Sequence, residues 1–298
     1  MVILTGLIQT MRPRQWSKNI VVFVPFVFTL NQAWQPFSSE MWRLMGLSLL
    51  AFVIFCVLSG AVYLINDLAD IEKDRLHPTK RSRALASGRL PGNVALVVAG
   101  ILLVVALTAA FWLRPLFALI GLAYAAINIA YSLVLKHWVI VDVFAVSSGF
   151  VLRAIAGAVV IGVPISPWLY VVAILLSLFI GINKRRNELV LLAGEAASHR
   201  PTLGDYTLPL LDEMTGVVTS ATVMAYSLYT FSAETLPQNH SMMLTIPFVI
   251  YGIFRYLYLI HVRNEGGDPS ELVFKDRPLL VAVGLWGLTV LGILYISR

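Results

Sequence analysis

Long apolar stretches recur along this chain from one end to the other, and they restrict its fold more than any other feature. Crossing about 30 Å of hydrocarbon at about 1.5 Å per residue takes roughly 20 apolar residues in a helix. The stretches that meet this requirement are approximately residues 17–35, 44–66, 93–113, 115–134, 138–161, 166–183, 214–233, 243–262 and 278–296. The sequence therefore predicts an all-α, polytopic membrane protein with nine transmembrane helices, forming one membrane-embedded domain over residues 1–298.

The composition agrees with a membrane location. Hydrophobic residues make up 58% of the chain and charged residues 13%, which leaves too little polar material to cover a soluble globule. Cys56 is the single cysteine, so no intrachain disulfide is expected. Residues 2–11 are too few to cross a bilayer, but their apolar side chains recur at helical spacing and predict a short interfacial helix.

The basic residues are distributed unevenly between the two sides of the predicted membrane. With the N-terminus placed in the cytoplasm, the outer connections contain only Arg43, Arg114 and Arg298. This asymmetry follows the positive-inside rule and predicts a cytoplasmic N-terminus in a plasma-membrane protein. It also accounts for the formal charge of +6, so a nucleic-acid partner is not expected. A homo-oligomer remains possible.

The three longest connections, residues 67–92, 184–213 and 263–277, all fall on the predicted cytoplasmic side. Function is expected to face the cytoplasm, because long polar connections usually carry the reactive side chains.

An aspartate-rich segment follows the second apolar stretch. Asp67, Asp70 and Asp74 stand at i, i+3 and i+7 and share one face if the helix continues, with Asn66 beside them. Three carboxylates on one face repel one another without a cation, and such oxygen ligands suit Mg²⁺ that keeps several waters. The segment predicts a Mg²⁺ site on the three aspartates, and all four residues are catalytic candidates. The alternative is a solvated loop whose acidic and basic residues merely neutralise one another.

Basic residues and buried charges supply candidate substrate contacts. Those downstream of the aspartates could neutralise a pyrophosphate, and those at the end of the sixth stretch could hold a monophosphate or act only as membrane anchors. Ionisable residues inside predicted spans usually mark a cavity because they are costly in lipid, although Arg153 fits structural pairing equally well. The candidate substrate-binding residues are Lys18, Lys80, Arg81, Arg83, Tyr131, Lys136, Asp142, Arg153, Lys184, Arg185, Arg255 and Lys275.

The pattern Asn66-Asp67-x-x-Asp70-x-x-x-Asp74 resembles the first aspartate-rich motif of the UbiA superfamily of intramembrane prenyltransferases, whose fold has nine helices. Other segments are similar to the branch of this superfamily that transfers phosphoribosyl groups to polyprenyl phosphates. They are Arg12-Pro13-Arg14-Gln15-Trp16-x-Lys18-Asn19, His77-Pro78-Thr79-Lys80-Arg81, Lys184-Arg185 with Glu188-Leu189, Gly266-Gly267-Asp268-Pro269, and Lys275-Asp276-Arg277-Pro278.

This resemblance implies Mg²⁺-assisted transfer of 5-phosphoribosyl from phosphoribosyl pyrophosphate to a decaprenyl-type polyprenyl phosphate in the membrane, with release of pyrophosphate. Aromatic prenyltransferases of the superfamily usually carry a second aspartate-rich motif at the end of the sixth helix, where this chain has basic residues between Asn183 and Glu188. A prenyl diphosphate donor with an aromatic or other acceptor is the alternative. A transporter is disfavoured because the sequence shows no convincing internal repeat.

Overall fold

The structure is a computed structural model that describes residues 2–77, 80–191, 201–234, 236–263, 265, 272, 273 and 275–296, with the side chains of residues 201 and 202 left out. Its long helices are α3 (Ser39–Ala69), α5 (Gly92–Leu113), α6 (Pro115–Leu133), α7 (Val141–Ile161), α8 (Pro167–Leu191), α10 (Leu208–Ser232), α11 (Ile246–His261) and α13 (Arg277–Ile296). Shorter α-helices are α1 (Val2–Met11), α2 (Val24–Phe28) and α4 (Ile71–Leu76). The 3-10 helices are η1 (Pro13–Phe23), η2 (Lys80–Ser82), η3 (Leu135–His137), η4 (Pro201–Gly204) and η5 (Ser241–Thr245).

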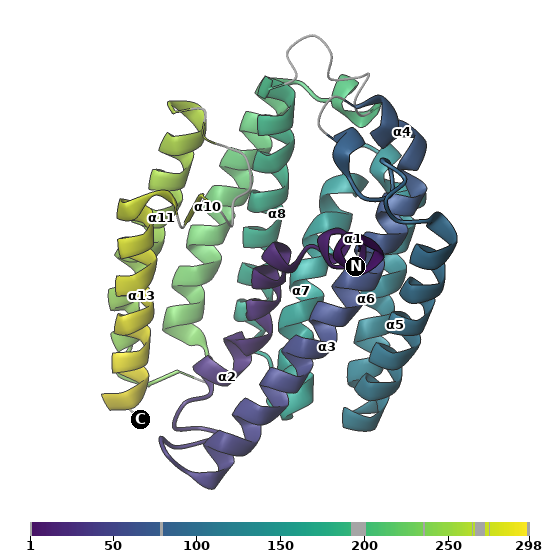
Figure 1. Ribbon diagram of the computed structural model, residues 1–298. Helices are drawn as coiled ribbons and strands as arrows, with labels where there is room; N and C mark the ends of the chain where they lie inside the picture. The colour runs from purple at the N-terminus through teal and green to yellow at the C-terminus, as the bar shows by residue number, and fades with distance from the viewer. Residues whose placement is uncertain are drawn as a thin grey trace.

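The long helices run side by side as one bundle (Figure 1). In the described part of the chain, seven helical segments are long and apolar enough to cross a membrane. They are α3, α5, α6, α7, α8, the segment Ser241–His261 that joins η5 to α11, and α13. The protein is therefore an all-helical, multi-pass membrane protein, and the short helix predicted at residues 2–11 is present as α1.

Two of the nine predicted spans differ from these seven. The stretch 17–35 is not one α-helix, because it passes from η1 into α2, which ends at Phe28. Pro25 lies in the first turn of α2 and has no backbone N–H, so an α-helix could not continue through it without losing a hydrogen bond. The stretch 214–233 lies almost wholly in α10, whose serines and threonines make it less apolar than the seven. The described structure therefore does not establish nine transmembrane helices.

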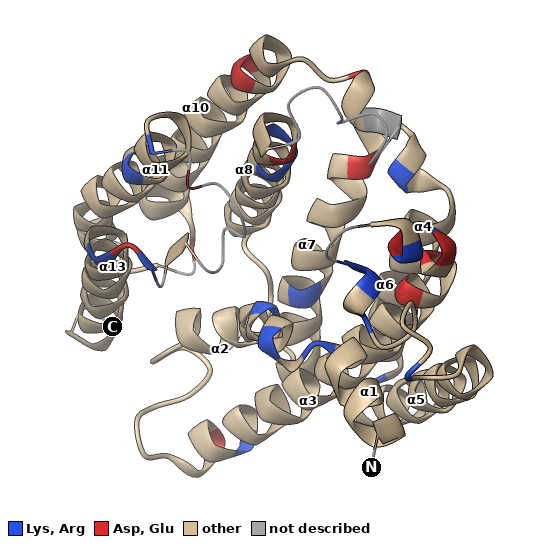
Figure 2. Ribbon diagram, turned by 45° about the horizontal axis from the view of Figure 1, so that its top comes forward, with Lys and Arg blue, Asp and Glu red and all other residues tan. Residues whose placement is uncertain are grey.

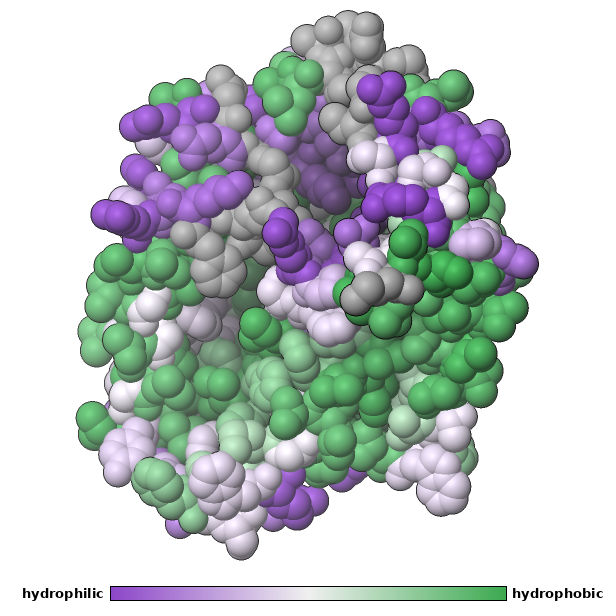
Figure 3. All heavy atoms as spheres, in the orientation of Figure 1, coloured by the Kyte–Doolittle hydropathy of each residue, from purple (hydrophilic) through white to green (hydrophobic). Residues whose placement is uncertain are grey.

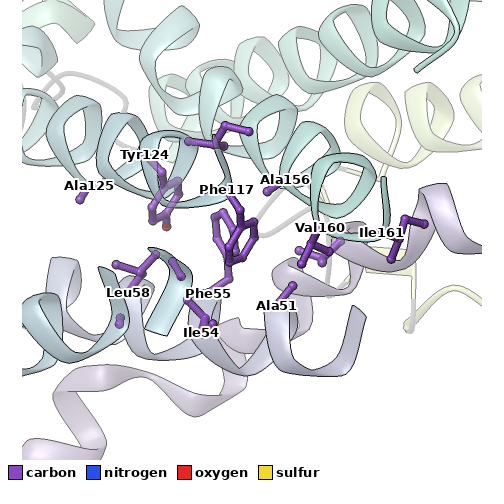
Figure 4. Packing of buried hydrophobic residues seen from close by; sticks show 14 of the residues in the cluster. Ala51, Ile54, Phe55, Leu58, Phe117, Tyr124, Ala125, Ala156, Val160 and Ile161 are labelled. Atoms are coloured by element: carbon purple, nitrogen blue, oxygen red, sulfur yellow. The ribbon is translucent and has the colours of Figure 1, made fainter. Parts of the chain in front are cut away.

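Most of the largest buried cluster lies between α3, α6 and α7. Phe55 of α3 meets Phe117 and Tyr124 of α6 edge-on, with ring centroids 5.9 and 5.4 Å apart. Figure 4 shows the Phe55 and Phe117 rings between Tyr124 and Val160 of α7. Offset and edge-on contacts of this kind are the favoured arrangement of aromatic rings. This packing supports the end of α3, which carries the aspartate-rich segment.

Gly157 lets η1 approach α7 closely, and replacing it should destabilise the protein. An added Cβ at residue 157 would lie 2.1 Å from the Val22 carbonyl oxygen, so η1 or α7 would have to move. We expect Gly157→Ala to cost about 1–3 kcal/mol, the usual range for overpacking a tight contact. Gly46→Ala in α3 is the matched control, because nothing lies within 4 Å of its Cβ position. Unfolding temperatures in detergent test the pair, and equal values would contradict the tight contact.

Candidate active site

The aspartate-rich segment occupies the end of α3 and the whole of α4. In Figure 2 acidic and basic positions meet around α4 and the adjacent end of α6. Asp67 is buried, and its Oδ1 lies 2.5 Å from Arg12 Nη2 and 3.3 Å from Arg83 Nη1. The same Arg83 nitrogen is 2.7 Å from Asp74 Oδ2. One guanidinium nitrogen therefore lies within hydrogen-bonding range of two of the three aspartates.

Asp70 lies where α3 ends and α4 begins. The helix predicted through this segment is interrupted here, because Asp70 has φ −103° and ψ 7°. The backbone bonds from Asp70 N to Asn66 O, 3.1 Å, and from Asp74 N to Asp70 O, 2.8 Å, nevertheless keep the residues on successive turns. Lys136 Nζ lies 2.6 Å from Asp70 Oδ1. The Ser132 hydroxyl donates to Asn66 Oδ1 over 2.8 Å, so the end of α6 and η3 close this side of the site.

The residues of this site fit a magnesium ion by their chemistry. In the described residues no three acidic, histidine or cysteine side chains are grouped closely enough to form a ready metal site. Each aspartate instead faces a basic side chain, and the Arg83 guanidinium lies where two carboxylates attract a cation. Carboxylate oxygens are the ligands that Mg²⁺ prefers, and Mg²⁺ commonly binds through one or two carboxylates together with substrate phosphates.

A second charged cluster lies inside the bundle between α7 and α8. Arg185 is 1% exposed and Asp142 is fully buried. The Nε of Arg185 lies 3.1 Å from Asp142 Oδ2 as an ion pair, while its Nη1 pairs with Glu188 and its Nη2 donates to the Tyr131 hydroxyl over 3.3 Å. Tyr206 donates to Asp142 Oδ1 over 2.8 Å. Arg185, which the sequence suggested as a phosphate-binding residue, is therefore paired with two carboxylates.

Arg153 is buried in α7 but does not pair with Asp142. In the described structure its guanidinium donates to Asn19 Oδ1 over 2.6 Å, to Gly149 O over 2.7 Å and to the Tyr124 hydroxyl over 2.8 Å. It also lies 4.6 Å from the centre of the Tyr124 ring. These contacts join η1, α6 and α7, and they favour the structural role over the substrate-binding role.

Arg255 of α11 pairs with Asp276, just before α13. Two contacts, Nε to Oδ1 at 3.1 Å and Nη2 to Oδ2 at 2.8 Å, form a bidentate pair. Asp276 Oδ1 also accepts from Leu279 N over 2.8 Å and so caps the start of α13. The hydrogen bond from Arg255 holds the pKa of Asp276 below its ordinary value. Arg255 therefore links α11 to the start of α13, at the same end of the bundle as Lys275.

The remaining candidate substrate-binding residues are exposed or half-buried. Lys80 and Arg81 are exposed in η2, Lys275 is exposed, and Lys18 and Lys184 are half-buried. The motif residues Pro78, Thr79 and Gly266 to Pro269 lie outside the described residues. Contact residues that were not among the sequence candidates include Arg12, Ser132 and Tyr206. Arg12 stood in a recognised motif, but nothing local in the sequence indicated that it contacts Asp67.

An apolar cavity of about 520 Å³ lies inside the bundle. It is bounded by η1, α2, α7, α8, α10, α11 and α13, and its walls are almost entirely apolar, with aromatic contributions from Phe28, Phe150, Tyr229 and Trp286. Ile180 in its wall is one helical turn from Lys184. Figure 3 shows hydrophilic residues concentrated around a hollow at the upper end of the molecule, above a broad apolar surface. Such a cavity can hold an apolar chain whose polar end reaches the charged residues.

This combination defines a multi-pass membrane protein that can bring a polar, anionic compound to an apolar one at one end of a helical bundle. The chain belongs to the UbiA prenyltransferase family, whose sequence model matches residues 14–275. It is 33% identical over 302 residues to the decaprenyl-phosphate phosphoribosyltransferase of Mycolicibacterium smegmatis, covering 99% of this chain and 94% of that protein. It is 34% identical over 288 residues to the protein of the same name from Mycobacterium tuberculosis, covering 97% and 94%.

The fold is also that of solved members of the family. The structure of a UbiA homolog from Archaeoglobus fulgidus bound to GPP and Mg²⁺ superposes with a TM-score of 0.72. The match covers 98% of this chain and all of that one, at 19% sequence identity. At this identity the likeness establishes the fold.

Proposed function

We propose that this protein transfers a 5-phosphoribosyl group from phosphoribosyl pyrophosphate to a polyprenyl phosphate of the decaprenyl type, releasing pyrophosphate at the cytoplasmic face of the plasma membrane. The observation that carries this proposal is the identity of 33–34% with decaprenyl-phosphate phosphoribosyltransferases over nearly the whole chain. The structure supports it, because it combines carboxylates for a metal–diphosphate with an apolar cavity whose wall includes Ile180, one helical turn before Lys184.

Asp67, Asp70 and Asp74 would hold the metal, with Asn66 beside them. When bound, Mg²⁺ would neutralise the charge that develops on the pyrophosphate leaving group. Arg83 and Lys136 already contact these carboxylates and are long enough to turn toward phosphate oxygens. The same side chains would then neutralise the rest of the donor's charge.

The acceptor needs little activation. Its phosphate is already ionised, so a general base is not required for its oxygen to attack the anomeric carbon. A new bond forms between that oxygen and the ribosyl carbon as the bond to pyrophosphate breaks, and the ribosyl group passes through an oxocarbenium-like state. The polyprenyl chain would lie in the apolar cavity, and Lys18 and Lys184 near its charged end would hold the lipid phosphate.

A prenyl diphosphate donor is the second candidate, and the solved relative bound to GPP favours it. The end of α8 argues against it in this chain. In place of a second set of metal-binding carboxylates, α8 has Lys184, Arg185 and Arg186, and Arg186 Nε lies 2.6 Å from Asp212 Oδ1. A basic helix end suits a directly bound phosphate better than a second metal.

Radiolabel transfer tests the proposal. Purified protein, polyprenyl phosphate and labelled phosphoribosyl pyrophosphate are expected to give an organic-extractable labelled product with Mg²⁺ and none with EDTA. Prenyl diphosphates with aromatic acceptors are the parallel arm. Folded protein that transfers prenyl groups, and leaves several chain lengths of polyprenyl phosphate unlabelled, would overturn the proposal in favour of the second candidate.

A further inference from the structure

The hydroxyl group of Tyr206 contacts Asp142 and the backbone of Ile140, and it has no direct part in the proposed reaction. Tyr206 lies just before α10 and is 3% exposed. Its hydroxyl donates to Asp142 Oδ1 over 2.8 Å and accepts from the Ile140 backbone N–H over 2.6 Å. Burial and the hydrogen bond to Asp142 raise the pKa of Tyr206 above its ordinary value, so the hydroxyl stays protonated and keeps both bonds at neutral pH.

The backbone at Ile140, whose N–H donates to the Tyr206 hydroxyl, is strained. Ile140 has φ 70° and ψ −49°, and the Val141 N–H donates to the Val139 carbonyl over 2.8 Å. These are the features of a γ-turn with positive φ, a rare conformation that is especially unfavourable for a β-branched residue. Strained backbone of this kind persists only where surrounding contacts hold it, and it is often found at functional sites.

This turn is joined directly to Lys136. Lys136 lies in η3, four residues before Ile140, and its Nζ is 2.6 Å from Asp70 Oδ1. Backbone bonds from Trp138 N to Leu135 O, 3.1 Å, and from Asp142 N to Trp138 O, 3.0 Å, connect η3 to the start of α7. The position of the turn and the position of Lys136 against Asp70 are therefore coupled.

Tyr206 is also held by Asp142 and by apolar side chains of α7, α8 and α10. Asp142 is fully buried and ion-paired with Arg185, which also pairs with Glu188. The ring of Tyr206 packs among buried apolar side chains that include Val143, Ile182 and Leu211. The hydroxyl is thus held by Asp142 at the start of α7, and the ring is held by side chains of α7, α8 and α10.

We propose that Tyr206 is a positioning residue, whose hydroxyl holds the Ile140 turn so that Lys136 lies against Asp70 where the metal–diphosphate binds. The inference deepens the proposed function, but it requires only that a diphosphate binds at the aspartates. It does not depend on whether the transferred group is ribosyl or prenyl.

A double-mutant cycle with inorganic pyrophosphate and Mg²⁺ tests this role by calorimetry on the detergent-purified full chain. Tyr206→Phe is expected to weaken pyrophosphate binding about tenfold, the order of effect of losing one hydrogen bond to a charged group. Lys136→Met should weaken it at least as much. Adding Tyr206→Phe to Lys136→Met should change the affinity by less than about twofold, because the two residues act through one contact. Tyr258→Phe loses a hydroxyl that accepts from Arg263 at the same end of the bundle, and should leave binding unchanged.

A rescue variant separates positioning from stability. Ile140→Gly adopts the positive φ without strain, so Ile140→Gly with Tyr206→Phe should regain most of the lost affinity. Independent, multiplicative losses from Tyr206→Phe and Lys136→Met would overturn the proposal, as would unchanged binding in folded Tyr206→Phe. Failure of both Tyr206→Phe and its Ile140→Gly rescue to fold would assign Tyr206 a structural role instead. Wild-type protein that binds Mg²⁺-pyrophosphate but labels no lipid would overturn the proposed reaction and leave this test intact.

Discussion

Asp70→Asn is expected to lower the rate of phosphoribosyl transfer on the order of 10²- to 10³-fold while the protein remains folded. Asparagine keeps the size of the side chain but removes the negative charge that would attract the metal, and preorganised charge of this kind is worth about that factor. Asp70 is the better choice for this test than Asp67, which is nearly inaccessible and faces both Arg12 and Arg83. Replacing Asp67 would also remove the carboxylate that two half-buried arginines contact.

Glu72→Gln is the matched control for Asp70→Asn. Glu72 is two residues further along, its side chain is 82% exposed, and it pairs with Arg75 at 2.9 Å. It is expected to keep near-normal transfer, because it lies outside the cluster that faces Arg83 and Lys136. Initial rates and size-exclusion profiles should be measured together for both variants. Normal Mg²⁺-dependent rates in Asp70→Asn would refute the assignment of this residue to the metal.

Arg185→Met is expected to destabilise the protein by about 3–5 kcal/mol, the usual result of removing one member of a buried ion pair. It would leave Asp142 fully buried without its cation and would remove the partner of Glu188. The unfolding temperature in detergent should fall on the order of 10 °C. Adding Asp142→Asn should restore part of this loss, because the second change removes the uncompensated charge.

Arg186→Met provides the comparison for Arg185→Met. The two arginines are adjacent in α8, but the partner of Arg186 is Asp212, whose side chain is 40% exposed, so its loss should cost about 1 kcal/mol or less. The phosphate-binding role of Arg185 inferred from sequence would be supported by a different result. Arg185→Met would then unfold at the wild-type temperature and lose affinity for polyprenyl phosphate in a vesicle-binding assay.

The fold was largely predictable because its signals are local. Seven of the predicted spans appear as long apolar helices, since a stretch of about 20 apolar residues has few alternatives to a helix in lipid. The first predicted span was wrong as a single α-helix. Hydropathy reports only apolar character, whereas Pro25 and the close packing at Gly157 determine that the segment contains η1 and the short α2.

In the candidate site, too, only the features that depend on local spacing could be predicted from the sequence. Asn66, Asp70 and Asp74 are separated by whole helical turns, so their proximity could be inferred from spacing. The ion pairs could not. Arg12 is 55 positions from Asp67, and Lys136 is 66 positions from Asp70, so only the packing of separate helices brings them together.

The sequence by itself determined that this chain crosses a membrane, that its aspartate-rich segment lies at one helix end, and which family it resembles. These features depend on composition, on periodicity and on short motifs. Only the tertiary structure decided that Arg185 is enclosed by carboxylates, that Arg153 has neutral partners, and that Tyr206 holds a strained turn. Each of these depends on which side chains meet across helices, because burial and pairing of a charge are set by the complete fold and not by its neighbours in sequence.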